Sequence, residues 1–399
     1  MRRWVAPAIY GALAVEVALI VWFAATYNAL DFYIYTLGGR AVTRDTHLYL
    51  AQLAAHWFTY TPFAAALFNP IAAIPIVIAR VMWELASVVA FASACVTTLK
   101  LAGYRASRTA VAAVVVTGLL LEPMWHSLFL GQINLFLLAL ILIDVRRVSR
   151  GRHAGIGVGI AAAIKLTPAI FIILFLLTRR TRAAVTAAGT FVLCGLIAYL
   201  IAPGASRLYW LHVFYDTKRV GAPYISNQSP YGAVLRIFGG VDHVGAWYLL
   251  VPLTIGVAGL TVAAVLGRHN DWLGAAAVTG ATGLLVSPIS WTHHWVWIMP
   301  ALVVLARGGT GSRIAALCGY LLFIMAPMWW TPRSGGPREY GFHGWLTLIA
   351  NCYLVAGLAF LAYMTRRAYL TSKVNVHSPV TVELMPLVAE RVGSSSGNS

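Results

Sequence analysis

The sequence predicts an all-α polytopic membrane protein, and three observations support this prediction. Hydrophobic residues occupy 60% of the 399 positions and charged residues only 10%, whereas soluble domains usually carry about a quarter charged residues. The mean hydropathy is +0.77. Apolar runs of about 18 residues or more recur along the chain, and each can cross a bilayer as a helix. Because these runs lack the alternation of barrel strands, helices are the expected spanning structure.

The predicted membrane segments follow from these apolar runs. They cover residues 5–27, 76–99, 109–128, 131–145, 183–202, 245–266, 272–286, 294–306, 313–330 and 344–365. Residues 153–178 have basic clusters at both ends and are too short for two full crossings, so we expect a pair of short, broken helices meeting at Lys165. With this pair the chain has about twelve membrane segments. Residues 60–75 contain three prolines, which favours a segment that dips into the outer face without spanning the membrane.

The basic residues predict the orientation of the chain. They form short clusters between apolar runs, at Arg2 and Arg3, Lys100 to Arg108, Arg146 to Arg152, Arg179 to Arg182, Arg268, Arg307 and Arg313, and Arg366 and Arg367. The positive-inside rule places these clusters, and hence both termini, in the cytoplasm of a plasma-membrane protein. The net charge of +17 therefore reflects topology, and we expect no nucleic-acid partner.

Two regions are expected in the chain: a transmembrane catalytic domain over residues 1–373, and a flexible cytoplasmic tail over residues 374–399 that ends in a Ser/Gly-rich stretch. The four cysteines lie inside apolar runs without metal-ligand spacing, and no carboxylate cluster is present. The sequence therefore predicts neither a metal nor a cofactor.

Unusual polar residues gather at the segment ends that this topology places on the outer face. Asp31 follows the first segment, and His293 and His294 lie beyond the segment 272–286. Lys165 lies in the broken pair, and an ionisable residue inside a membrane is by default functional. The further candidates for substrate binding are Gln132 and Asn134 in one outer turn, and Arg219, Asn227 and Gln228 in the loop 203–244.

These residues also have structural interpretations. Asp31 could be a solvated helix cap, and the two histidines could be interfacial anchors among the tryptophans. Lys165 could form a structural ion pair with Glu122 or Asp144. The amide side chains could be hydrogen-bonding partners in helix packing.

Six sequence blocks resemble glycosyltransferase family 87. They are LDFYIYTLGG, YTPFAAALFNP, GQIN, KLTP, NQSPYGAVLRIFG and SPISWTHHWVW, and they run in the family's order across about residues 30 to 300. The last block is highly specific, whereas GQIN and KLTP are weak alone. The resemblance is greatest to the mycobacterial polyprenol-phosphate-mannose-dependent α-mannosyltransferases of phosphatidylinositol mannoside synthesis.

The resemblance implies a GT-C fold with an active site facing the extracytoplasmic side. It implies inverting transfer of mannose from polyprenyl-phosphate-mannose to a glycolipid acceptor, such as a phosphatidylinositol mannoside or lipomannan, with an α-(1→2) bond formed. It assigns the catalytic base to Asp31, with Asp45 as the second candidate, and it places His293 and His294 in the catalytic site. Lys165, Arg219 and the histidines are then the candidates for holding the donor phosphate.

Two other functions compete with this one. A lipid or sugar transporter would also have about a dozen helices, but transporters usually show related halves and a midplane site. No internal repeat is visible here, and the polar groups lie toward one face. A non-enzymatic scaffold of cell-wall assembly would tolerate substitution of Asp31 and the histidines.

Overall fold

The structure is a computed structural model that describes residues 2–44, 47–334 and 338–376. Asp45 and the larger part of the predicted tail, residues 377–399, lie outside the described residues. The described part is helical, and its only extended pairings are isolated bridges between Leu53 and His56 and between Asn227 and Trp291. The predicted all-α class is therefore confirmed.

The elements follow one another as short and long helices. The α-helices are α1 (Arg2–Thr26), α2 (Leu30–Ala41), α3 (His47–Leu50), α4 (Pro62–Phe68), α5 (Ile76–Leu101), α6 (Arg108–Leu119), α7 (Glu122–Leu130), α8 (Asn134–Ser149), α9 (Ile156–Ile164), α10 (Ile170–Leu177), α11 (Thr181–Ile201), α12 (Pro203–Leu208), α13 (Pro230–Phe238), α14 (Leu250–Arg268), α15 (Trp272–Val286), α16 (Ile298–Ala306), α17 (Thr310–Met325), α18 (Trp345–Ala350) and α19 (Cys352–Val376). Short 3-10 turns cover Val42–Arg44, Ile71–Ala73, Thr167–Ala169, Thr217–Arg219, Val241–His243, Ala246–Leu249, Thr292–Trp297, Pro327–Trp330 and Glu339–Gly341, and a π-helical turn covers Tyr209–Val213.

Five of the described helices are long and apolar enough to cross a membrane. They cover Trp4–Thr26, Ile76–Leu101, Thr181–Ile201, Ala246–Arg268 and Thr310–Trp330. Shorter apolar helices cover Thr167–Leu177, Trp272–Val286 and Thr292–Ala306. The structure thus supports a membrane-embedded helical protein but does not confirm the count of about twelve segments, which rests on apolar length alone.

The predicted membrane segment 109–128 is not one continuous helix. The chain bends by 77° between Arg108–Leu119 and Glu122–Leu130, so this run is a broken span or a re-entrant loop. Pro123 occupies the first turn of α7, where a proline starts a helix more readily than it continues one. The bend places Glu122 and His126 inside the protein.

The predicted break at Lys165 is confirmed. Helix α9 ends at Ile164, Lys165 has extended backbone angles (φ −144°, ψ 128°), and a 3-10 turn at Thr167–Ala169 leads into α10. The Thr61 hydroxyl donates to the carbonyl of Ala163 at the end of α9. Non-helical backbone within a membrane protein requires such internal partners.

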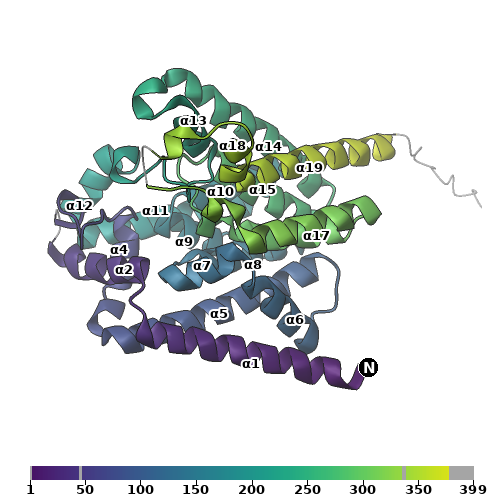
Figure 1. Cartoon of the computed structure of the whole chain (residues 1–399), viewed down its shortest axis with the longest axis horizontal. Coiled ribbons are helices and arrows are strands. Elements are labelled where there is room, and N and C mark those ends of the chain that lie inside the picture. The colour runs from purple at the N-terminus through teal and green to yellow at the C-terminus, as the bar shows by residue number, and fades with distance from the viewer. Residues whose placement is uncertain (1, 45–46, 335–337, 377–399) are drawn as a thin grey trace, which may run out of the picture.

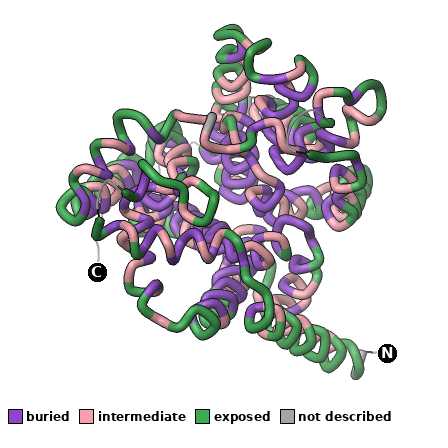
Figure 2. The backbone as a smooth tube through the Cα atoms, turned by 60° about the vertical axis from the view of Figure 1, so that its left-hand side comes forward, coloured by how far each residue is buried: buried purple, intermediate pink, exposed green. Residues whose placement is uncertain are grey.

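Helix α1 lies along the outside of the bundle, and Figure 2 shows it exposed along almost its whole length. Its exposed side chains include Trp4, Leu19 and Trp22, with 79%, 57% and 63% of their surfaces accessible. Large apolar side chains exposed in a continuous row favour contact with lipid.

The helices pack side by side, with α5 against α8, α9 against α11, and α14 against α15. The start of α1 and the end of α19 lie toward the same end of the bundle, whereas α2, α4 and α12 lie toward the opposite end (Figure 1). Asp31 belongs to α2 and is therefore remote from both of these chain ends.

Candidate active site

Helix α2 positions Asp31 in its first turn, where a carboxylate interacts favourably with the helix dipole. The helix is fixed against α4, because the Asn69 side chain donates to the Gly39 carbonyl at 2.7 Å. The rings of Tyr35 and Phe68 stack between the same helices, with centroids 4.4 Å apart. The Asp31 side chain is therefore presented from a well-packed element, while it stays partly accessible.

The turn between α7 and α8 places Gln132 beside this carboxylate. Gly131 adopts a left-handed conformation (φ 72°), and a Cβ there would lie 2.3 Å from the Arg80 guanidinium and 2.5 Å from the Phe32 side chain. Only glycine suits this position. Trp83 donates its indole N–H to the Gly131 carbonyl at 2.9 Å, which holds the turn in place.

Gln132 connects Asp31 to two tyrosines. The hydroxyls of Tyr35 and Tyr60 donate to Gln132 Oε1 at 2.7 and 2.8 Å. Because both donors lie on the oxygen, the amide nitrogen is directed to Asp31, where it donates to Oδ2 at 2.6 Å. Gln132 thus orients the carboxylate.

Burial raises the pKa of the Asp31 carboxyl above its usual range, while the hydrogen bond from Gln132 and the charge of Lys165 act in the opposite direction. A carboxylate with a raised pKa is a stronger base than an exposed one. Efficient general bases have pKa values near the pH at which they operate.

Lys165 reaches into the same region from the break between α9 and α10. Its Nζ lies 2.8 Å from His294 Nε2, 3.4 Å from Asn134 Oδ1 and 5.5 Å from the centroid of the Tyr60 ring. Neither hydrogen-bonding partner is a carboxylate, so an anion that enters this region could become an ionic partner of Lys165.

The alternative of a structural ion pair for Lys165 is wrong. Glu122 pairs with His126 at 2.8 Å, and Asp144 accepts a hydrogen bond from the Val158 backbone at 2.8 Å. Neither carboxylate approaches the lysine in the structure.

His293 is buried beside His294, with ring centroids 4.6 Å apart. Its backbone carbonyl accepts from the Asn134 side chain at 2.8 Å and from the Ser127 hydroxyl at 3.1 Å. Neither ring nitrogen has a hydrogen-bond partner among the described residues. Buried polar atoms normally have partners, so these nitrogens mark a place for a bound polar group.

His126 is a further member of this cluster and was not among the residues predicted from the sequence. Its Nδ1 lies 2.8 Å from Glu122 and 2.9 Å from the Thr292 hydroxyl, and its ring centroid is 5.3 Å from that of His293. Glu122 is fully buried and also accepts from Trp329 and Tyr353. The available signal was the spacing of four between Glu122 and His126 within an apolar run, which places both on one helix face.

Asn227 and Gln228 are fully buried and bond to backbone groups. The Asn227 side chain donates to the Pro288 carbonyl at 3.0 Å and accepts from the Ser290 N–H at 2.9 Å. The Gln228 side chain donates to the Ala350 carbonyl at 2.7 Å. The Asn227 contacts support the backbone that precedes the two histidines, whereas the Gln228 side chain joins its loop to the start of α19.

Arg219 lies apart from the cluster. It donates to the Tyr49 carbonyl at 2.8 Å, pairs with Asp216 at 3.2 Å, and covers the Trp57 ring at 4.5 Å from its centroid. The structure therefore brings together Asp31, Gln132, Asn134, Lys165 and the two histidines, but not Arg219.

Among the residues that the structure describes, no group of three or more His, Cys, Asp or Glu side chains is arranged to hold a metal ion.

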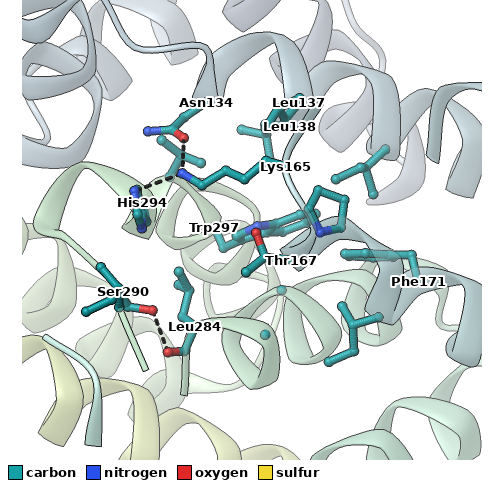
Figure 3. A pocket seen from close by; sticks show the side chains of 17 residues that line it. Asn134, Leu137, Leu138, Lys165, Thr167, Phe171, Leu284, Ser290, His294 and Trp297 are labelled. Carbon is teal, nitrogen blue, oxygen red and sulfur yellow. Dashed lines mark hydrogen bonds between the residues drawn. The ribbon is translucent and has the colours of Figure 1, made fainter. Parts of the chain in front are cut away.

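A pocket adjoins this cluster. Lys165, Asn134 and His294 form its polar end, and most of the remaining lining is apolar, from α8, α10, α15 and Trp297, with Thr167 and Ser290 as further polar residues (Figure 3). The cluster and the pocket can accommodate an anionic group that carries an apolar chain.

The fold and site define an all-helical membrane protein in which a carboxylate, a lysine and histidines meet beside an apolar pocket. The chain belongs to glycosyltransferase family 87, which it matches over residues 58–288.

Its relatives include mycobacterial enzymes. It is 33% identical to the polyprenol-phosphate-mannose-dependent alpha-(1-2)-phosphatidylinositol mannoside mannosyltransferase of Mycobacterium tuberculosis, over 90% of this chain and 91% of the relative. It is 31% identical to the corresponding phosphatidylinositol pentamannoside mannosyltransferase of Mycolicibacterium smegmatis, over 84% of this chain and 85% of the relative. No solved structure matches the chain.

Proposed function

We propose that this protein is an inverting mannosyltransferase that uses polyprenyl-phosphate-mannose as donor and a phosphatidylinositol mannoside or related glycolipid as acceptor, and forms an α-(1→2) bond. The observation that carries the proposal is the placement of the Asp31 carboxylate and the Lys165 ammonium group around Gln132 and Tyr60. This arrangement offers a base and a fixed cation to one reacting centre. Membership of a glycosyltransferase family and the names of the relatives support the same reaction.

The reaction proceeds in one step. Asp31 accepts the proton of the acceptor hydroxyl while the oxygen of that hydroxyl attacks the anomeric carbon of mannose. The bond from that carbon to the phosphate oxygen breaks on the opposite side, and its electron pair leaves with the polyprenyl phosphate. In-line attack on a β-linked donor gives the α-linked product, and no general acid is needed because a phosphate is a good leaving group.

Lys165, His294 and His293 hold the phosphate in this mechanism. Negative charge grows on the phosphate as the bond breaks, and a fixed cation in a site with little water stabilises it more than bulk solvent would. The two ring nitrogens of His293 that lack partners can donate or accept one hydrogen bond each. Gln132 orients the base, and Asn134 supports Lys165 and the His293 backbone. Asn227 supports the loop that precedes the histidines, and Gln228 ties its own loop to the start of α19.

We further propose the GT-C fold over residues 1–373, with both termini in the cytoplasm and the site on the extracytoplasmic side of the plasma membrane. The start of α1 and the end of α19 lie toward the same end of the bundle, which supports placing both termini on one side of the membrane (Figure 1). The basic clusters in the loops support the cytoplasm as that side. Arg219, which lies apart from the cluster, is the reserve candidate for a phosphate contact.

A transfer assay tests the proposed function. Membranes that contain the protein are incubated with radiolabelled polyprenyl-phosphate-mannose and a phosphatidylinositol mannoside acceptor, and control membranes lack the protein. A labelled glycolipid that is sensitive to α-(1→2)-mannosidase is expected only with the protein. Donor movement across vesicles without a glycolipid product would instead indicate a transporter.

A further inference from the structure

The pocket beside Lys165 changes character along its length. Its polar end is formed by Lys165, His294 and Asn134, and its walls beyond are mostly apolar and include Leu138, Phe171 and Trp297, with Thr167 beside the indole (Figure 3). The Ser290 hydroxyl on its lining is already bonded to the Leu284 carbonyl at 2.7 Å. Apolar walls of this kind disfavour a sugar, whose hydroxyls would lose their hydrogen bonds to water.

We propose that this pocket binds the isoprenoid segment nearest the phosphate of the lipid donor, with the phosphate at Lys165 and His294 and with Gly280 and Trp297 fixing the width of the pocket. The proposal rests on the proposed function, which supplies the identity of the lipid.

Gly280 gives the pocket a fixed aromatic wall. A Cβ at Gly280 would lie 2.0 Å from the Trp297 ring, so the indole lies directly against the bare backbone of α15. The Phe171 ring stacks on the same indole with centroids 5.1 Å apart and planes inclined by 23°. Two stacked rings form a rigid, flat surface. The planar double bonds and methyl branches of an isoprenoid fit such a surface without the ordering that a flexible acyl chain would require.

The position of the polar end favours the donor lipid over the acceptor lipid. The bond to the donor phosphate breaks in the step in which the base acts, so this phosphate must lie close to Asp31. Tyr60 lies between Asp31 and the polar end of the pocket. Its hydroxyl bonds to Gln132, the partner of Asp31, and its ring centroid lies 5.5 Å from Lys165 Nζ. The phosphate of a phosphatidylinositol acceptor has no such constraint.

Photolabelling tests binding without relying on transfer. The probe is a polyprenyl phosphate that carries a diazirine on its first isoprene unit. Labelling of the wild-type protein is expected within 137–141, 170–171 or 280–297, where the pocket walls lie. Labels confined to other segments would overturn the proposal.

A substitution that fills the pocket sharpens the test. A Cβ at Gly283 would lie at ordinary contact distance, 3.6 Å, from Ile170, so Gly283→Leu extends into the pocket without a backbone clash. The matched control is Gly189→Leu on α11, where a Cβ meets nothing within 4 Å. Labelling is expected to fall at least about tenfold in Gly283→Leu and to stay unchanged in Gly189→Leu, since one isoprene unit contributes several buried carbons. Equal labelling of both variants would contradict the proposal.

Kinetics then distinguish the two lipids. In the transfer assay, Gly283→Leu is expected to raise the KM for polyprenyl-phosphate-mannose at least about tenfold and to leave the KM for the acceptor unchanged. A rise in the acceptor KM alone would place the acceptor lipid in the pocket and overturn the proposal. Specific labelling of a protein that transfers no mannose would refute the proposed function but not the lipid site.

Discussion

The Asp31 carboxylate accepts a 2.6 Å hydrogen bond from the Gln132 amide, although the two residues lie 101 positions apart. Two tyrosine hydroxyls fix the orientation of that amide. The hydrogen bond holds the carboxylate in one position and opposes the effect of burial on its pKa. Gln132 thereby sets both the direction and the strength of the proposed base.

Removing this hydrogen bond should change the pH dependence of transfer. The base acts when it is deprotonated, so activity falls as the pH drops through the pKa of Asp31. Because the bond from Gln132 lowers that pKa, Gln132→Met should move the acidic limb of kcat/KM to higher pH, by about one unit. The exposed Gln52→Met is the control. An unchanged acidic limb in Gln132→Met would show that Gln132 does not act on the base.

Loss of the proposed phosphate contacts should reduce both donor binding and turnover. Lys165→Met and His294→Ala are each expected to lower kcat/KM by about 100- to 1,000-fold, because the growing phosphate charge loses its fixed partner. Affinity for a non-reactive donor analogue should fall in the same variants, with thermal stability close to that of the wild type. The exposed Lys100→Met serves as control.

If both variants, and a His293→Ala variant, bind the analogue as the wild type does, the phosphate lies elsewhere. If these variants yield less folded protein but each folded molecule keeps normal activity, the residues have a structural role. Arg219→Met would then be the next variant to measure.

The pair formed by Glu122 and His126 should stabilise the fold. His126→Leu removes one of the three hydrogen-bonding partners of a fully buried carboxylate, so it should lower the free energy of unfolding by about 1–3 kcal/mol. His126→Gln retains a donor and should restore part of this loss. The exposed His243→Leu is the control in thermal unfolding in detergent. Equal stability of His126→Leu and the wild type would refute this role.

The proposed orientation can be measured by thiol labelling in intact cells. The background is Cys318→Ser, since Cys318 is the exposed cysteine of the chain. A cysteine at exposed position 242 should react with an impermeant reagent, and one at exposed position 153 should react only after the cells are opened. The reverse pattern would invert the topology and place the site on the cytoplasmic side.

Much of the fold was predictable from hydropathy. The long apolar helices and the break at Lys165 follow from apolar length, basic clusters and prolines. The bend between α6 and α7 was not predictable in this way, because both sides of Leu120 are equally apolar and the only local signal is Pro123. Apolar length alone also does not decide the number of membrane segments, since short helices such as α10 and α15 are apolar as well.

The candidate site was predictable in its composition but not in its connections. Asp31, Lys165 and the histidines stand out as polar residues in apolar surroundings. The sequence does not reveal that Gln132 contacts Asp31, or that Tyr35 and Tyr60 orient Gln132, because these contacts join segments remote in sequence. Asn227 and Gln228 stood out for the same reason as the others, yet the structure shows their side chains bonded to backbone groups.

Mannosyl transfer by an Asp31→Asn variant tests the central claim most directly. The change preserves shape and removes basicity, so turnover of radiolabelled polyprenyl-phosphate-mannose should fall about 100- to 10,000-fold. Protein level and donor-analogue affinity should stay near wild type, and the exposed Asp242→Asn variant should retain full activity. Turnover close to wild type in Asp31→Asn would contradict the assignment of Asp31 as the base and, with it, the proposed mechanism.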